Sequence, residues 1–146
     1  MVAGGMAVVL HGVVRLTVDL DIIVSLIPAN VARFASAMEE LGYRPKVPVK
    51  AIEFADPKKR LSWIKDKGMK VFSFYNPKKV GELIDVFVNE PIPYKDLNKE
   101  KKIVSAGKIR IPIVSIKHLK KLKRIAGREQ DLADIRSLEN LEGLIK

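Results

Sequence analysis

The chain has 146 residues, 47% hydrophobic and 30% charged, as in a folded domain that buries most of its apolar surface. It contains no cysteine, which excludes disulfides and thiolate metal sites and favours a reducing compartment, the cytoplasm. Its formal net charge is +10. Such a charge either attracts polyanions such as nucleic acid and nucleotides or reflects the surface ion-pair networks of a protein from a heat-loving source.

The apolar run near the N-terminus is too short for a membrane span, and no basic segment precedes it as in a secretory signal.

This apolar run follows Gly4 and Gly5 and leads to a predicted strand over residues 19–24. Asp19 and Asp21 share one face of that strand, about 6.6 Å apart along it. Because two such carboxylates repel each other, they favour a hard cation such as Mg²⁺ between them.

This stretch resembles the signature of the nucleotidyltransferase superfamily, whose fold is shared by DNA polymerase beta and aminoglycoside nucleotidyltransferases. The pattern is Gly-Gly or Gly-Ser, a short helix, and a strand with acid-x-acid; here thirteen residues separate Gly5 from Asp19. Arg15-x-Thr17 before the acid pair is similar to the small stand-alone branch that includes AbiEii-like abortive-infection toxins. Family members usually have a helix and a strand before the glycines. Only three residues precede them here, so we expect a lost edge element or a natural start further upstream.

The resemblance implies an α/β (α+β) fold with a mixed sheet, helices mainly on one face, and one domain over residues 1–146. After the first strand, the sequence predicts a helix over 31–41 with Asn30 as N-cap, a basic helix from Phe54 to Lys67, and strands over 69–75 and 82–88. A hairpin of 101–105 and 108–114 follows. The chain then forms a helix over 116–126, between Ser115 and Gly127, and a helix over 128–141; these two make a helical pair over about 115–146 that packs on the domain. Trp63 on the basic helix either fills the core, the commoner role of a lone tryptophan, or stacks on a base.

Asp85 lies in the middle of the predicted strand 82–88, between Ile84 and Val86, where aspartate has a low β propensity. Either that face of the sheet is open to water or the carboxylate has a functional partner. The resemblance implies a functional partner, because in the family a hydrophobic-Asp-hydrophobic motif on a neighbouring strand supplies the third carboxylate of the site.

Two charged residues are predicted to point inward in the C-terminal helical pair. On a helical wheel, Lys123 falls among the apolar residues of the first helix. In the last helix, Asp131 falls on the apolar stripe to which Leu132 is also assigned. Buried charges need partners, so either Lys123 or Arg128 bridges Asp131, or Lys123 binds a nucleotide phosphate, and both roles are compatible. The spacing from Lys123 to Asp134 resembles a C-terminal motif of the toxin-like branch.

The resemblance implies a metal-dependent nucleotidyltransferase that transfers a nucleoside monophosphate from a nucleoside triphosphate to a hydroxyl and releases pyrophosphate. The implied catalytic and metal-binding residues are Asp19, Asp21 and Asp85, with two Mg²⁺ or Mn²⁺ ions. The implied nucleotide-binding residues are Gly4, Gly5, Arg15, Thr17 and Lys123. The acceptor stays open among tRNA or another RNA, a protein hydroxyl, a sugar and a drug. The alternative is an inactive relative that acts as a basic RNA- or nucleotide-binding module, although three carboxylates would weaken a polyanion site that lacks metal.

Overall fold

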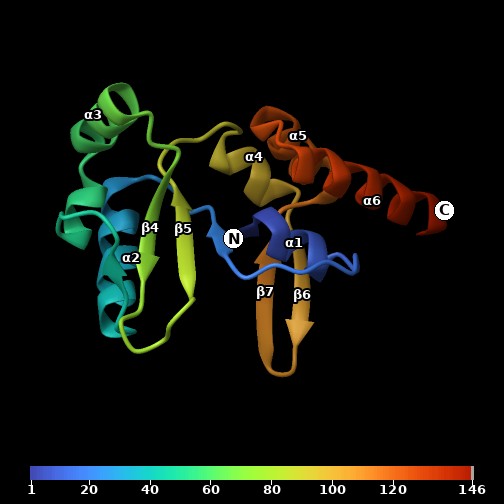
Figure 1. Cartoon of the computed structure of the whole chain (residues 1–146), viewed down its shortest axis with the longest axis horizontal. Helices are drawn as coiled ribbons and strands as arrows, with labels where there is room; N and C mark the ends of the chain where they lie inside the picture. Colours follow the sequence, from blue (N-terminus) through green and yellow to red (C-terminus); the bar gives the residue numbers. More distant parts are fainter. Residues whose placement is uncertain (146) are drawn as a thin grey trace. The chain divides into compact units, whose positions relative to one another are not determined.

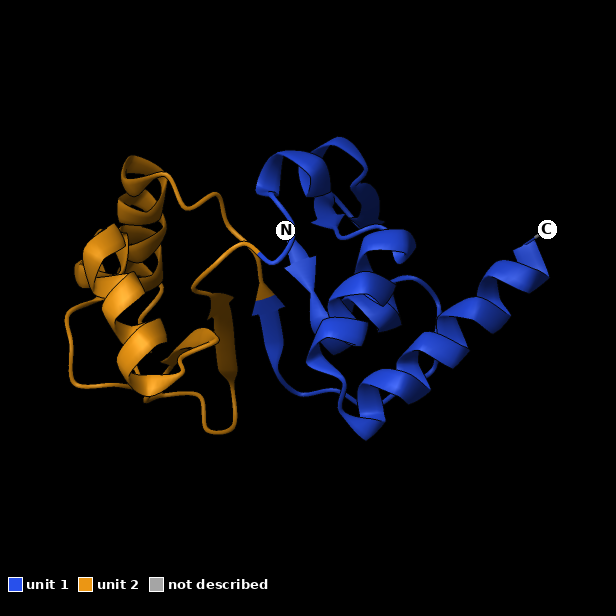
Figure 2. Ribbon diagram, turned by 90° about the horizontal axis from the view of Figure 1, so that it is seen from above, with its two compact units in different colours: residues 1–21, 91–146 blue, residues 22–90 orange. Residues whose placement is uncertain are grey.

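The computed structural model describes residues 1–145, which form two compact units (Figure 2). Unit 1 combines residues 1–21 with the described residues from Pro91 onward, and unit 2 is the continuous segment Ile22–Glu90. Figure 1 labels the helices and strands of both units. Both parallel and antiparallel strand pairs occur within unit 1, so the predicted mixed sheet is confirmed.

Unit 1 is built on strands that come from the two ends of the chain. Its elements are β1 Val2–Ala3, α1 Gly4–Leu10, most of β2 Leu20–Ile22, α4 Tyr94–Lys99, β6 Lys102–Ala106, β7 Ile109–Ile113, α5 Ile116–Ala126 and α6 Glu129–Ile145. β1 pairs with β7 in parallel, and β6 pairs with β7 as the predicted antiparallel hairpin. α1 packs against α5 and α6, so the N-terminal helix is held by the C-terminal pair.

Local sequence signals set the ends of the C-terminal helices. The Ser115 side chain accepts a hydrogen bond from the backbone N–H of His118, which satisfies one of the free donors at the start of α5. Gly127 ends α5 in the left-handed region at φ 66°, where glycine carries no Cβ penalty. The predicted N-cap and stop are therefore confirmed, whereas the last helix runs four residues beyond the predicted 141, to Ile145.

Unit 2 places its helices on one face of a three-stranded antiparallel sheet. Its elements are α2 Pro28–Glu40, β3 Arg44–Pro45, the 3₁₀ helix η1 Ala51–Ala55, α3 Pro57–Lys67, β4 Val71–Tyr75 and β5 Leu83–Phe87. On β4 the fully buried Phe72 stacks on Phe54 at 4.9 Å and on Trp63 at 5.3 Å between ring centroids. Trp63 is 8% exposed, so its predicted role in the core is confirmed.

Three element predictions near the first strand and the second helix are corrected by the structure. β2 is only Leu20–Ile22, so Asp19 lies just outside the strand. The helix predicted over 31–41 begins at Pro28, because proline's fixed φ suits the first helical position. Asn30 therefore lies inside α2, where its side chain donates to the carbonyl of Ser25 instead of capping the helix.

Further along the chain, two more predictions are corrected. The basic helix begins at Pro57, capped by the Asp56 side chain, and Phe54 belongs to η1. Three further elements, β1, β3 and α4, were not predicted, and each is only two to six residues long. Such short elements carry too few residues to show a hydrophobic period.

Candidate functional site

Gly4 and Gly5 form the centre of a cluster in unit 1. Gly4 has φ 58°, and a Cβ added there would lie 1.9 Å from Oδ2 of Asp21. A Cβ at Gly5 would lie 1.8 Å from Nη1 of Arg15 and 2.8 Å from Oγ1 of Thr17. Since real Cβ atoms do not come so close to other atoms, the missing side chains are what allow these three polar groups to lie against the glycine backbone.

The segment between α1 and β2 presents its polar residues to this cluster. Arg15 and Thr17 are half-buried, while Val14 and Leu16, which alternate with them, are 102% and 97% exposed. This alternation is typical of extended chain, in which every second side chain points the same way. Of the predicted site residues, the structure therefore brings together Gly4, Gly5, Arg15, Thr17 and Asp21; Asp19 is exposed next to them in the sequence.

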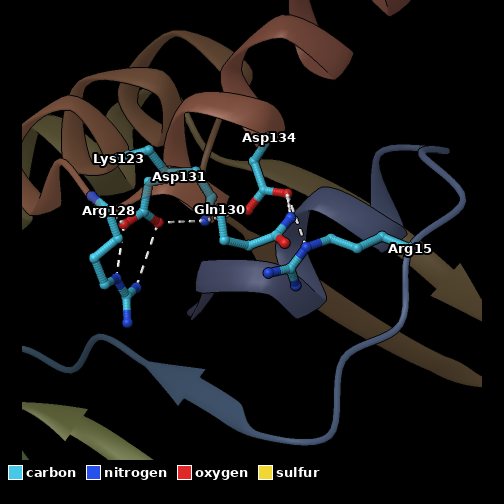
Figure 3. A network of polar contacts seen from close by, with 6 residues as sticks. All are labelled: Arg15, Lys123, Arg128, Gln130, Asp131 and Asp134. Carbon is cyan, nitrogen blue, oxygen red and sulfur yellow. Dashed lines mark hydrogen bonds and ion pairs between the residues drawn. The ribbon is translucent and has the colours of Figure 1, made fainter.

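A buried network of charges joins Arg15 to the helical pair (Figure 3). Nε of Arg15 lies 2.8 Å from Oδ1 of Asp134, and Nζ of Lys123 lies 2.7 Å from Oδ2 of the same carboxylate. Both contacts are ion pairs. Lys123 also donates to Asp131 at 3.1 Å, so the predicted bridge between these two residues is confirmed. Asp131 and Asp134 are 1% and 2% exposed, which means that Lys123 compensates two buried carboxylates.

Asp131 is also held by Arg128 at the corner between α5 and α6. Nε of Arg128 donates to Oδ2 at 2.7 Å, and Nη2 donates to Oδ1 at 3.3 Å. These hydrogen bonds, with the attraction of Asp131 and a smaller one from Asp21, raise the pKa of Arg128 above its ordinary value. Burial opposes ionisation of Asp131, but the hydrogen bonds from Arg128 and Lys123 outweigh it and lower the pKa of Asp131.

Asp134 was not predicted to have a structural role, and Leu132 was predicted to lie on the buried stripe of the last helix. Leu132 is instead 47% exposed, and Asp134 takes an inward position. The signal was the spacing itself, because residues three apart lie on one helix face and Asp134 is three residues after the inward-pointing Asp131.

Asp85 lies in unit 2. It is half-buried in the middle of β5 and stands opposite Ser73, whose hydroxyl donates to its Oδ1. The neighbouring cross-strand pair, Phe72 and Val86, is fully buried. This pair lies on the other face of the sheet, where Phe72 makes its aromatic contacts with the helices. Asp85 therefore occupies the face opposite those contacts, and its convergence with Asp19 and Asp21 stays a prediction.

With this geometry described, the chain can be compared with known proteins. No protein-family model matches it, and no curated protein matches it in sequence. Among solved structures it is similar to the lincosamide antibiotic adenylyltransferase LnuA with lincomycin bound, at a TM-score of 0.56 and 19% identity, over 96% of this chain and 85% of that one. The chain has a nucleotidyltransferase fold. The narrower resemblance to AbiEii-like toxins stays a prediction.

The fold family implies a divalent metal ion at the acid pair, Asp19 and Asp21. Within residues 1–145, no three His, Asp or Glu side chains are grouped closely enough to form a metal site by themselves. The donor set at Asp19 and Asp21 nevertheless fits a hard cation, because both groups are carboxylates. The space beside Gly4 lets the Asp21 carboxylate lie next to the backbone. No helix in the described part of the chain is both long and apolar enough to cross a bilayer.

Proposed function

We propose that this protein is a metal-dependent nucleotidyltransferase, which transfers a nucleoside monophosphate from a nucleoside triphosphate to an acceptor hydroxyl. The observation that carries the proposal is the contact of Gly4 with Asp21, in which a left-handed glycine admits a carboxylate against the start of α1. That contact joins the two halves of the Gly-Gly and acid-x-acid pattern in space. The fold and the adenylyltransferase activity named for LnuA support the same chemistry.

In the proposed reaction the acceptor oxygen bonds to the α-phosphorus, and the bond from that phosphorus to the bridging oxygen of the β-phosphate breaks. Pyrophosphate leaves with the electron pair of the broken bond, and the hydroxyl proton passes to Asp85. Mg²⁺ or Mn²⁺ on Asp19, Asp21 and Asp85 would neutralise phosphate charge when bound. Gly4 and Gly5 serve nucleotide binding by letting Asp21, Arg15 and Thr17 lie against their backbone, where side chains on the glycines would displace them.

Three other residues have supporting roles in the proposal. Arg15 and Thr17 line the backbone of Gly5, where they orient the nucleotide. Lys123 is 6% exposed and bound to two carboxylates, which supports a role in fixing the helical pair beside the site more than direct contact with phosphate. We also propose that the protein works in the cytoplasm, because it has no cysteine.

The acceptor is proposed only as a hydroxyl compound. LnuA is crystallised with lincomycin, which supports a drug-like acceptor among the open candidates, the others being tRNA, other RNA, protein hydroxyls and sugars. Incubation of the protein with labelled nucleoside triphosphates and separate RNA, protein and small-molecule fractions of a cell extract would identify the class. The label should appear in one fraction only, and only when Mg²⁺ or Mn²⁺ is present.

The proposal is tested by calorimetric titration of triphosphates with and without Mg²⁺. Mg²⁺ should tighten binding to the native protein, and Asp19→Asn with Asp21→Asn should remove that enhancement. Asp66→Asn with Asp96→Asn is the matched control, because it removes the same two charges from exposed surface positions. An equal Mg²⁺ enhancement in the Asp19 and Asp21 variant would contradict the proposal.

A basic binding module is the second candidate function. Residues 101–128 contain ten lysines and arginines and no acidic residue, which favours association with a polyanion. A binding module would hold RNA without Mg²⁺ and without turnover. Such binding would persist, or become tighter, in the variant that lacks the charges of Asp19 and Asp21.

A further inference from the structure

Arg128 is an exposed cation on a rigid support. It directly follows Gly127, and its own backbone N–H and two of its guanidinium nitrogens all contact the carboxylate of Asp131, at 2.7 to 3.3 Å. Asp131 is itself buried and bound to Lys123. Even so, the Arg128 side chain is 78% exposed. The guanidinium plane is therefore fixed from one edge, while its other edge faces solvent.

The other two cations of the network are placed differently. The Lys123 side chain is 6% exposed and lies between Asp131 and Asp134, so its charge is already compensated. The Arg15 side chain is 19% exposed, with Nε at Asp134 and Nη1 against Gly5. Only Arg128, of the three, presents most of its surface to a ligand. The hydrogen bonds of its guanidinium to Asp131 use Nε and Nη2.

Arg128 is near one carboxylate of the acid pair, that of Asp21. The negative charge of Asp21 acts on Arg128, so the two groups are within electrostatic reach inside unit 1. Figure 3 shows the guanidinium extending from the helical corner toward β2, the strand that carries Asp21. The Asp131 end of this ion pair is buried and the Arg128 end is exposed, so the pair helps to hold the corner and still leaves one edge of the guanidinium toward solvent.

Arginine is well suited to bind phosphate, because its planar group donates several hydrogen bonds in fixed directions. We infer that Arg128 contacts the terminal phosphates of the nucleoside triphosphate through Nη1 and the second Nη2 proton, and stabilises the pyrophosphate that leaves. This inference rests on the proposed function. The contact with Asp131 holds the guanidinium in place before the nucleotide binds, so little side-chain freedom is lost on binding.

The test compares Arg128→Gln with Arg124→Gln. Arg124 is a matched control because it lies one turn earlier on α5, is 57% exposed and pairs with a single carboxylate, that of Glu139, at 3.4 Å. The four common nucleoside triphosphates are titrated into the native protein with Mg²⁺, and the tightest is then compared with its monophosphate in each variant. Arg128→Gln should weaken triphosphate binding about ten- to a hundredfold and leave monophosphate binding within about twofold. Arg124→Gln should change neither.

Each other outcome overturns the inference. Equal weakening by both variants would mean general attraction by positive charge, and equal weakening of triphosphate and monophosphate binding would mean a structural effect on the whole site. Unchanged triphosphate binding in Arg128→Gln would exclude Arg128 while the proposed function stands. If no triphosphate binds the native protein, both the inference and the proposed function fail.

If Arg128→Gln does not fold, Arg128→Lys replaces it, and its triphosphate affinity should fall at least about threefold, because lysine loses the fork geometry. An unchanged affinity in Arg128→Lys would overturn the inference.

Discussion

At the scale of single residues, Gly4 combines a left-handed backbone with a close side-chain contact. Its φ of 58° disfavours any side chain, and the Asp21 carboxylate occupies the place of its Cβ. Gly68 has almost the same φ, 60°, but a Cβ there would meet nothing within 4 Å. Alanine substitutions at the two glycines therefore separate two contributions to the free energy of unfolding, that of a left-handed backbone and that of displacing Asp21.

We predict that Gly68→Ala lowers the free energy of unfolding by about 1–2 kcal/mol, the cost of a left-handed alanine. Gly4→Ala should lower it by about 1–3 kcal/mol more, because Asp21 must move. It should also abolish the Mg²⁺ enhancement of triphosphate binding. Urea unfolding and titration of both variants measure these effects. Equal losses of stability would mean that Asp21 moves away from Gly4 at no cost.

His11 provides a second residue-level prediction, on pH. Its Nε2 donates to the carbonyl of Val114 at 2.8 Å, and its buried Nδ1 has no hydrogen-bond partner among residues 1–145. Burial lowers the pKa of His11, helped by the charge of Lys102 and opposed by the Val114 hydrogen bond and by Glu142. The unfolded chain, with a histidine pKa of about 6.5, therefore binds a proton more readily than the folded one.

The contribution of His11 to stability is consequently full above about pH 6.5 and falls as the pH drops from there toward the lower folded pKa. Melting temperatures of the native protein should fall between pH 7.5 and 5, and His11→Gln should show a smaller fall. Both variants are measured over the same pH series. A fall of equal size in His11→Gln would assign the pH dependence to other groups.

At the scale of elements, the corner between α5 and α6 is held by charges more than by apolar packing. We predict that Lys123→Met lowers the free energy of unfolding by about 3–5 kcal/mol, because it leaves two buried carboxylates without their shared cation. Adding Asp131→Leu should restore most of this loss, since Asp134 keeps Arg15 and Gln130 as partners. Urea unfolding of the single and double variants measures the difference.

The same double variant decides the function of Lys123. Triphosphate affinity equal to the native value would remove Lys123 from the nucleotide site. A loss of about tenfold or more in a folded variant would establish a phosphate contact of Lys123 only if Asp131→Leu alone, which takes away the support of Arg128, leaves the affinity unchanged. A double variant that remains as unstable as Lys123→Met would show that Asp134, and not Asp131, is the carboxylate that requires Lys123.

At the scale of the whole molecule, the net charge of +10 is unevenly distributed, with an acid-free stretch over residues 101–128. The hairpin of β6 and β7 exposes Lys102 and Arg110 within that stretch. We predict that a single-stranded RNA oligonucleotide binds with a logarithmic salt slope of about −3 or steeper, as expected for four or more phosphate contacts. Fluorescence anisotropy at several salt concentrations gives the slope.

Lys102→Gln with Arg110→Gln should make that slope shallower by about 1.4, or 0.7 for each lost phosphate contact. Lys65→Gln with Lys67→Gln, which removes the same charge from exposed positions of α3, is the control and should leave it unchanged. Equal changes in both pairs would mean that RNA is attracted by the overall charge and has no preferred surface.

Local patterns in the sequence were enough to predict most of the helices and strands. Ser115 and Gly127 were correctly assigned to the ends of α5, because capping depends on neighbouring residues only. The inward positions of Lys123 and Asp131 followed from the helical period. The Gly-Gly and acid-x-acid pattern implied the nucleotidyltransferase fold, which the similarity to LnuA confirms. The single domain, the metal ions and the three-carboxylate site stay predictions.

Only the tertiary structure decided which of these residues meet. Arg15 and Asp134 are 119 positions apart in the sequence, yet they form an ion pair at 2.8 Å. The pairing of β1 with β7 and the packing of α1 on α5 and α6 bring the two ends of the chain together in unit 1. Asp21 meets Gly4 within the N-terminal segment itself, where the chain that follows α1 leads to β2. A pattern of residue types records the period of one helix or strand. Contacts between distant segments depend on how those elements pack, and a single sequence does not contain that information in any local form.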